Sequence, residues 1–297
     1  MLKIEDSRLA TPLIGSLWML ASSFLFAGMG VFVKLGSADL AAAELLFYRS
    51  MLGLLITYSL IRYNAIPLKT RHWRKHVLRG VVGFAAMMSL FLAITLLPVA
   101  TAMTLNYTSP IFLTAIAFAL HQNRMRRAGY LAIASGFVGV ALLLRPTLHG
   151  NDWAGELLGL GSGFLAGIAI YHTRQLGKMG EPSSRIVFYF MLICSICSAS
   201  WMIVSGISEL SMTTAIWILG VGLLGTGGQL AMTRAYSISH SVAVSSLTYC
   251  TILFTCLFGI LFFGDSFDTI AWIGIALIVF GGIVATYSDR PQPSAES

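Results

Sequence analysis

Ten apolar runs of membrane-spanning length follow one another along this chain of 297 residues, and they constrain its fold more than any other feature. A helix that crosses a bilayer needs about 20 consecutive apolar residues. The runs that meet this requirement are residues 11–33, 40–61, 77–96, 100–120, 128–145, 153–173, 186–206, 213–233, 241–263 and 269–287. Only 10% of the residues are charged, whereas soluble domains carry about 25%. The sequence therefore predicts an all-α integral membrane protein with ten transmembrane helices in the lipid bilayer, and it excludes a soluble globule.

Basic residues are distributed unevenly over the predicted connections. If the N-terminus is inside, the cytoplasmic segments and helix ends, Arg79 among them, hold 16 of the 19 Lys and Arg residues, and only Lys34, Arg49 and Arg145 lie elsewhere. Short basic loops are retained on the cytoplasmic side of a membrane. We therefore expect a multi-pass protein of the cell inner membrane with both termini in the cytoplasm. The net charge of +7 does not indicate nucleic-acid binding, because neither stacking aromatic residues nor a folded soluble domain accompanies the basic residues.

The two halves of the chain resemble each other. A shift of 142 residues aligns five pairs without a gap, namely Gly80 with Gly222, Gly83 with Gly225, Ala93 with Ala235, Tyr107 with Tyr249 and Gly139 with Gly281. We expect a first five-helix repeat over residues 1–148, a second over 149–289 and a cytoplasmic tail over 290–297. Because five is odd, the second repeat must enter the membrane in the opposite orientation. Such inverted repeats are typical of secondary transporters, whose substrate site lies near the membrane midplane between the halves.

One doubled motif resembles a known family. Its first copy runs through Ala93-Ile94, Leu97-Pro98-Val99-Ala100 and Leu105-Asn106-Tyr107-Thr108-Ser109-Pro110-Ile111-Phe112, and its second through Ala235-Tyr236, Ser241-Val242-Ala243, Leu247-Thr248-Tyr249 and Phe263-Gly264-Asp265. This pattern resembles the EamA repeat of the drug/metabolite transporter superfamily. The resemblance implies a ten-helix carrier of small metabolites, often an exporter of amino acids or their relatives.

The chain departs from the family pattern at two places. The family commonly has Leu-Gly-Glu at the ends of the fourth and ninth helices, whereas this chain has His121-Gln122-Asn123 and Phe263-Gly264-Asp265. The second copy also has Ile252 where the first has Pro110. A helix break caused by proline is therefore expected at Pro110 and in the first half only.

Polar and aromatic residues at mid-membrane depth are the candidates for a solute pathway, because a polar side chain in hydrocarbon is unfavourable unless it faces protein or water. The candidate substrate-binding residues are Trp18, Arg49, Met87, Asn106, Tyr107, Phe164, Tyr171, Gln229, Thr248 and Tyr249. The repeat places Asn106-Tyr107 opposite Thr248-Tyr249, and Met87 opposite Gln229. For the amides of Asn106 and Gln229, a hydrogen bond between helices is the alternative to lining a cavity. For a single Thr hydroxyl, the alternative is a bond to its own helix.

Arg49 is the charged residue expected deepest in the membrane. It lies about nine residues into the second predicted helix, roughly 13 Å deep at 1.5 Å per residue. A cation at the membrane centre costs at least ~2.5–3.5 kcal/mol, so it should face a polar cavity or an anionic partner. Two roles stay open, binding of a substrate carboxylate and anchoring of helices. Glu44, near the outer end of the same helix, is the candidate coupling group.

Motifs for other chemistry are weak or absent from the sequence. Gly220-Val221-Gly222-Leu223-Leu224-Gly225 matches a dinucleotide fingerprint but lies in an apolar span without a βαβ unit. These glycines, with Gly159, Gly163 and Gly167, are expected to let helices approach closely. The four cysteines fall in predicted spans, and no metal-ligand or nucleophile motif occurs. We therefore expect no cofactor, no metal and no enzymatic activity.

The predicted function is secondary transport of a small-molecule substrate by alternating access. Export of an amino acid or a related polar or amphipathic metabolite is the main expectation. Uptake of a vitamin-like or nucleotide-derived metabolite is the alternative, and a membrane-embedded enzyme and a structural or receptor protein are the rival classes. The solute, the coupling ion and the oligomeric state are not fixed by the sequence.

Overall fold

The structure is a computed structural model, and it describes residues 3–121, 131, 134–136, 138, 139, 142, 153–205, 208–238 and 247–288. Every regular element in these residues is helical. The helices are α1 (Lys3–Gly36), α2 (Ala42–Tyr63), α3 (Trp73–Leu96), α4 (Val99–Asn106), α5 (Ser109–His121), α7 (Trp153–Lys178), α8 (Ser183–Ser205), α9 (Met212–Ile238), η1 (Leu247–Tyr249), α11 (Cys250–Phe258), η2 (Gly259–Phe263) and α12 (Thr269–Ser288). The predicted all-α fold is confirmed, and the described positions of the fifth predicted helix, 128–145, are also helical.

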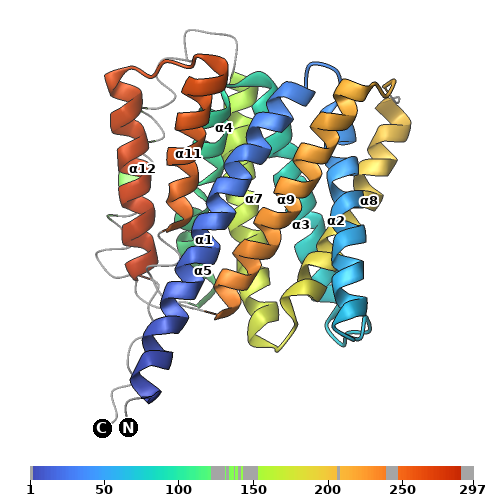
Figure 1. The fold of residues 1–297 in the computed structure, drawn as a ribbon. Coiled ribbons are helices and arrows are strands. Elements are labelled where there is room, and N and C mark those ends of the chain that lie inside the picture. The colour runs from blue at the N-terminus through green and yellow to red at the C-terminus, as the bar shows by residue number, and fades with distance from the viewer. Residues whose placement is uncertain are drawn as a thin grey trace.

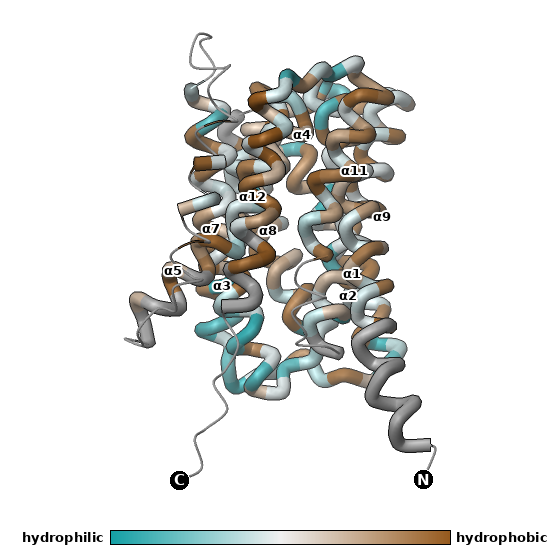
Figure 2. The backbone as a smooth tube through the Cα atoms, turned by 90° about the vertical axis from the view of Figure 1, so that its left-hand side faces the viewer, coloured by the Kyte–Doolittle hydropathy of each residue, from teal (hydrophilic) through white to brown (hydrophobic). Residues whose placement is uncertain are grey.

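The helices run side by side in one bundle, and their connections gather at its two ends (Figure 1). We call the end with the α2–α3 and α7–α8 connections the inner end, and the opposite end the outer end. Helix α1 begins and α12 ends at the inner end (Figure 1). Hydrophilic residues are concentrated in the connections there (Figure 2). The start of α1 and the end of α12 lie at the same end of the bundle, which is consistent with an even number of membrane crossings.

Six described helices have the length and apolar composition of membrane spans: Ile14–Gly36, Ala42–Tyr63, Trp73–Leu96, Trp153–Lys178, Ser183–Ile203 and Met212–Tyr236. Two shorter apolar helices follow, Leu247–Phe263 and Thr269–Gly281. Of the two other predicted crossings, the fourth is divided between α4 and α5, and the fifth is described at residues 131, 134–136, 138, 139 and 142. The arrangement fits ten helices in two inverted five-helix repeats.

The fourth crossing, the apolar run 100–120 in which a break is expected at Pro110, is divided into two helices. Helix α4 ends at Asn106, Tyr107 and Thr108 form a turn, and α5 begins at Ser109. Pro110 lies in the first turn of α5, where its missing N–H leaves no helical hydrogen bond unmade. The break therefore occurs just before the proline.

The ninth crossing is also irregular, although Ile252 replaces the proline there. It opens with the 3-10 turn η1, continues as α11 and ends in the π-helical segment η2. Leu247–Tyr249 aligns with Leu105–Tyr107 in the repeat, so the described part of the second half has an irregularity of its own at this position, without a proline. It does not bear on the expectation of a proline-caused break in the first half only. A 3-10 turn needs no proline, because such turns are frequent at the ends of ordinary α-helices.

The halves are joined by three extensive helix pairs, α1 with α9, α2 with α8 and α3 with α7. Close approach between helices needs glycine at particular points. At Gly163 a Cβ atom would lie 2.6 Å from the carbonyl oxygen of Leu105, so only glycine fits against the end of α4. The glycine spacing in α7 therefore serves helix packing, as predicted.

Candidate functional site

A cavity of about 1570 Å³ lies between the two halves. Ligand sites for small molecules are typically about 300–1,000 Å³, so it can hold a metabolite together with water. Helices of both halves form its wall, α1 and α3 from the first half and α7, α8 and α9 from the second. Asn64 and Ile66 of the α2–α3 connection and Gly180, Glu181 and Pro182 of the α7–α8 connection also line it. The cavity therefore reaches the inner end of the bundle.

The outer end is closed by packed helix ends. Among the described lining residues, none belongs to an outer connection. Leu97, Val99 and Ala100, where α3 meets α4, are at most 1% exposed. The Nζ of Lys34 donates hydrogen bonds to the carbonyl oxygens of Ile94, Thr95 and Leu97 at 2.9, 3.2 and 3.0 Å. This ammonium group satisfies the free carbonyls at the C-terminal end of α3, where the helix dipole favours a cation.

Glu44 adds a second contact at the outer end. Its Oε2 accepts hydrogen bonds from the Ala41 amide and the Ser208 hydroxyl, at 2.8 and 2.7 Å, and its Oε1 accepts one from the Ser208 amide at 2.7 Å. The side chain is buried. Because Glu44 begins α2 and Ser208 lies between α8 and α9, the carboxylate ties the two halves together.

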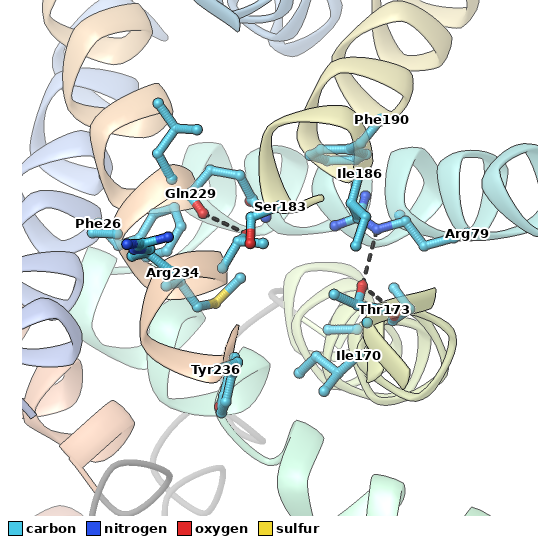
Figure 3. A pocket seen from close by; sticks show the side chains of 18 of the residues that line it. Phe26, Arg79, Ile170, Thr173, Ser183, Ile186, Phe190, Gln229, Arg234 and Tyr236 are labelled. Carbon is cyan, nitrogen blue, oxygen red and sulfur yellow. Dashed lines mark hydrogen bonds between the residues drawn. The ribbon is translucent and has the colours of Figure 1, made fainter. Parts of the chain in front are cut away.

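Arg79 is the buried cation of the cavity wall (Figure 3). Its Nε donates a hydrogen bond to Thr173 Oγ1 at 3.1 Å, and its guanidinium carbon lies 4.0 Å from the centre of the Phe190 ring. The residue is 5% exposed, and NH1 has no hydrogen-bond partner among the described residues. Arg79 therefore has unused hydrogen-bond donors in a part of the cavity wall that also contains an aromatic ring.

The sequence placed Arg79 with the cytoplasmic basic residues because the third apolar run begins at 77. The structure begins α3 at Trp73, so Arg79 lies inside the helix rather than at its end. A signal was present in the spacing of Arg79 and Gly83, which share one helix face four residues apart. A Cβ at Gly83 would lie 3.1 Å from Arg79 NH1, so the glycine leaves room for the guanidinium.

Six of the ten candidate substrate-binding residues lie in the cavity wall, and so does the predicted helix-break residue Pro110: the six are Trp18, Met87, Asn106, Tyr107, Gln229 and Thr248. Asn106 Nδ2 also donates a hydrogen bond to Ser162 Oγ at 3.0 Å, so this amide both lines the cavity and joins two helices. Gln229 is 3% exposed, and its Nε2 has no partner in the described part of the chain. It is the second unused donor of the wall.

The other four candidates, Arg49, Phe164, Tyr171 and Tyr249, are outside the described lining. Arg49 is 0% exposed and sits against Gly225, whose carbonyl oxygen is 3.5 Å from NH2. Its Nε and NH1 have no partner among the described atoms. Phe164 packs edge to face on Phe112 with ring centres 5.5 Å apart. These residues support the helices that surround the cavity.

A polar cluster joins the halves at the mouth of the cavity. Glu181 accepts hydrogen bonds from Arg185 NH1 at 2.8 Å and from the Thr70 hydroxyl, and His76 Nε2 lies 3.4 Å from its Oε2. Burial alone raises the pKa of the Glu181 carboxyl, but the hydrogen bonds from Thr70 and Arg185 and the positive charge of Arg185 bring it below its ordinary value. Glu181 is therefore a charged, fully engaged carboxylate.

Both halves of the chain are similar to a known family of proteins. The model of the EamA-like transporter family matches residues 13–145 and again 153–287. The pseudopaline exporter CntI of Pseudomonas aeruginosa (strain UCBPP-PA14) is 29% identical over 276 residues, covering 93% of this chain and 97% of that protein. A riboflavin transporter of Rhizobium johnstonii is 26% identical over 281 residues, covering 94% and 91%.

Two further proteins are similar to this chain over almost its whole length. An S-adenosylmethionine uptake transporter of Rickettsia prowazekii is 24% identical over 299 residues, covering 98% of both chains. A crystal structure superposes with a TM-score of 0.68 at 17% identity, covering 92% of this chain and 96% of the other. At that identity the likeness shows the fold alone.

Proposed function

The chain belongs to the EamA-like transporter family, and from this premise we propose that it is a secondary transporter that moves a small metabolite across the cell inner membrane by alternating access. It acts on its solute by movement and not by chemical conversion, so it is not an enzyme. One observation carries the proposal: a cavity between the two halves reaches the inner end, while the outer end is closed. Alternating access requires one state that is open at the inner end and another that is open at the outer end.

Export of an amino acid or a related polar or amphipathic metabolite is the form of transport we propose. The wall combines aromatic and aliphatic side chains with the unused donors of Arg79 and Gln229, which suits an amphipathic solute. The relative named a pseudopaline exporter supports this direction. The relatives named riboflavin transporter and S-adenosylmethionine uptake transporter support the alternative, uptake of a vitamin-like or nucleotide-derived metabolite.

We further propose a membrane arrangement with the inner end of the bundle in the cytoplasm. Both termini are then cytoplasmic, residues 1–148 and 149–289 form the two repeats, and 290–297 form the tail. The two separate family matches support the division into halves. Lys69 and Arg71 in the α2–α3 connection support the orientation, because basic loops stay in the cytoplasm.

The proposed substrate contacts are the lining residues of the two halves. Trp18, Met87 and Tyr107 offer apolar and aromatic surface, and Asn106, Gln229 and Thr248 offer hydrogen bonds. Glu44 is proposed as the coupling group, because protonation of its carboxylate would weaken the contact between α2 and the α8–α9 connection.

Two measurements test the proposal. Metabolites in cells and medium are first compared between a deletion strain and an overexpressing strain; we expect the solute to rise in the medium of the overexpressing strain. That solute is then loaded into liposomes with and without the purified protein, and we expect faster, chemically unchanged release from the protein-containing vesicles. Chemical conversion of the solute, or equal release from both kinds of vesicle, would contradict the proposal.

A further inference from the structure

The cavity wall carries more positive than negative charge. Its described cations are Arg79, Arg174, Lys178 and Arg234, and its one described carboxylate is Glu181. Glu181 is already engaged by Arg185, Thr70 and His76 and so does not balance the deeper part of the cavity. The cavity is therefore electrostatically suited to an anionic solute.

We propose that Arg79 is the anion-binding residue of this cavity and that it selects solutes in which a carboxylate adjoins an apolar or aromatic body. This inference rests on the proposed transport function and narrows it to a substrate class. Neither the family match nor the relatives assign a task to this arginine.

Arg79 is held in one orientation before any solute binds. The Thr173 hydroxyl donates to the Ala169 carbonyl oxygen at 2.8 Å, so its oxygen is free to accept from Arg79 Nε. The Phe190 ring covers one face of the guanidinium at 4.0 Å. A side chain that is fixed in this way loses little conformational entropy on binding.

The remaining donors of Arg79 match a carboxylate. A guanidinium has five N–H donors in a planar fork, and Nε uses one of them for Thr173. NH1 is buried without a partner among the described residues. A buried, uncompensated cation is unfavourable, and an arriving anion would remove that penalty. The single charge and paired oxygens of a carboxylate fit one guanidinium, whereas a phosphate monoester brings up to two charges.

Arg49 reinforces the site from behind the wall. It lies within electrostatic range of Arg79, and the two positive charges repel. An anion at Arg79 would be attracted by both, so the second buried cation acquires a role without touching the solute. The wall also holds the apolar side chains of Met87, Ile170 and Ile186, and Ile170 and Ile186 lie beside Arg79 and Thr173 (Figure 3). This surface accounts for the apolar body of the proposed solute.

The test compares an acid with its neutral isostere. Purified protein in detergent is titrated at pH 7.5 with indole-3-acetate, indole-3-acetamide or phenyl phosphate, and binding is followed by the rise in unfolding temperature. We expect indole-3-acetate to bind and the amide to bind about ten- to a hundredfold more weakly, the range for loss of a charge-assisted hydrogen bond. Tighter binding of phenyl phosphate than of the acid would overturn the choice of carboxylate.

Four variants locate the effect. Arg79→Gln should abolish the preference for the acid, and Arg79→Lys should keep part of it, because charge remains but the fork is lost. Gly83→Ala should weaken acid binding although every charge remains, because its methyl group would crowd NH1 at 3.1 Å and the Phe190 ring at 2.9 Å. Arg74→Gln is the matched control: it removes an exposed charge from the same helix outside the cavity and should leave the preference unchanged.

The results separate this inference from the transport proposal. Equal binding of acid and amide by the wild type, no binding of the acid, or an unchanged preference in Arg79→Gln would each overturn the anion site. The wild-type comparison needs no variant, so it decides even if Arg79→Gln does not fold. Protein that prefers the acid but moves no solute in liposomes would keep the anion site and remove the transport proposal.

Discussion

The buried arginines Arg79 and Arg49 occupy different surroundings. Arg79 faces the cavity beside Thr173 and Phe190, whereas Arg49 is packed between helices against Gly225. Neither has an acidic partner in the part of the chain that the structure describes. A lone buried charge lowers stability, so each of these arginines is a candidate for a function that needs positive charge.

At this scale we predict that Arg49→Met leaves the unfolding temperature of the purified protein equal to or above that of the wild type. The change replaces an unpaired cation by an apolar side chain of similar length. Binding of indole-3-acetate should weaken by less than about tenfold, because Arg49 acts on the cavity only through the field of its charge. The preference for acid over amide should remain. A large drop in unfolding temperature would instead assign Arg49 to helix anchoring.

At the scale of elements, the two ends of the bundle carry related contacts. At the outer end, Glu44 at the start of α2 binds Ser208 in the α8–α9 connection. At the inner end, Glu181 just before α8 accepts hydrogen bonds from Thr70 in the α2–α3 connection and from Arg185 in α8. Since α2 and α8 are equivalent helices of the two repeats, each half clamps the connection of the other.

The outer contact gives a prediction for Glu44→Gln. An amide nitrogen cannot accept the bonds that Ala41 and Ser208 donate, so at least one donor loses its partner. We expect a loss of stability of about 1–3 kcal/mol. Amide hydrogen exchange should also become faster in residues 41–45 and 208–211. Ser208→Ala is the graded comparison, because it removes the hydroxyl bond but keeps the backbone one, and it should have a smaller effect on both measurements. Unchanged exchange in Glu44→Gln would show that this contact does not hold the outer end closed.

The inner contact gives a prediction for pH. The pKa of Glu181 is lower in the folded protein than its ordinary value, so its contribution to stability is present above the ordinary carboxyl pKa of about 4.3 and is lost as pH falls through the lower, folded value. The difference in unfolding temperature between wild type and Glu181→Gln should therefore be largest near neutral pH and shrink on acidification below about pH 4–5. A difference that stays constant over this range would mean that Glu181 is not held as a carboxylate by Thr70 and Arg185.

At the scale of the whole molecule, charge separates along the axis of the bundle. The described outer connections hold Asp39, Glu209, Asp265 and Asp268, whereas Lys69 and Arg71 lie in the α2–α3 connection at the inner end. The cavity reaches the inner end, where these basic residues lie. In the proposed orientation the cavity collects solute from the cytoplasm, the direction that export requires.

The orientation is tested by reporter fusions. A reporter that is active only in the cytoplasm should be active when fused after Ser297 and inactive when inserted in residues 146–152, because five helices separate the two sites. A second reporter active only outside the cytoplasm should give the opposite pattern and serves as the control for expression. Activity of one reporter at both sites would exclude the inverted repeat together with the proposed orientation.

The sequence by itself determined the helical membrane fold, the internal repeat and the family, because these depend on local properties. In lipid, an apolar run of about 20 residues can form all its backbone hydrogen bonds only as a helix. The repeat is visible in the sequence because equivalent residues of the two halves keep the same spacing. The sequence also indicated Asn106, Gln229 and four other residues of the cavity wall, since polar or aromatic side chains at membrane depth tend to face protein.

Only the tertiary structure decided which cation faces the cavity and that the ninth crossing is irregular as well. Whether Arg49 or Arg79 lines the space depends on how α2 and α3 are rotated against the helices they pack on. The structure also begins α3 at Trp73, so Arg79 lies inside the helix and not at its end. Helix rotation follows from side-chain packing between segments far apart in the chain, which no local pattern encodes. The 3-10 turn at Leu247–Tyr249 likewise has no proline within it to indicate it in the sequence.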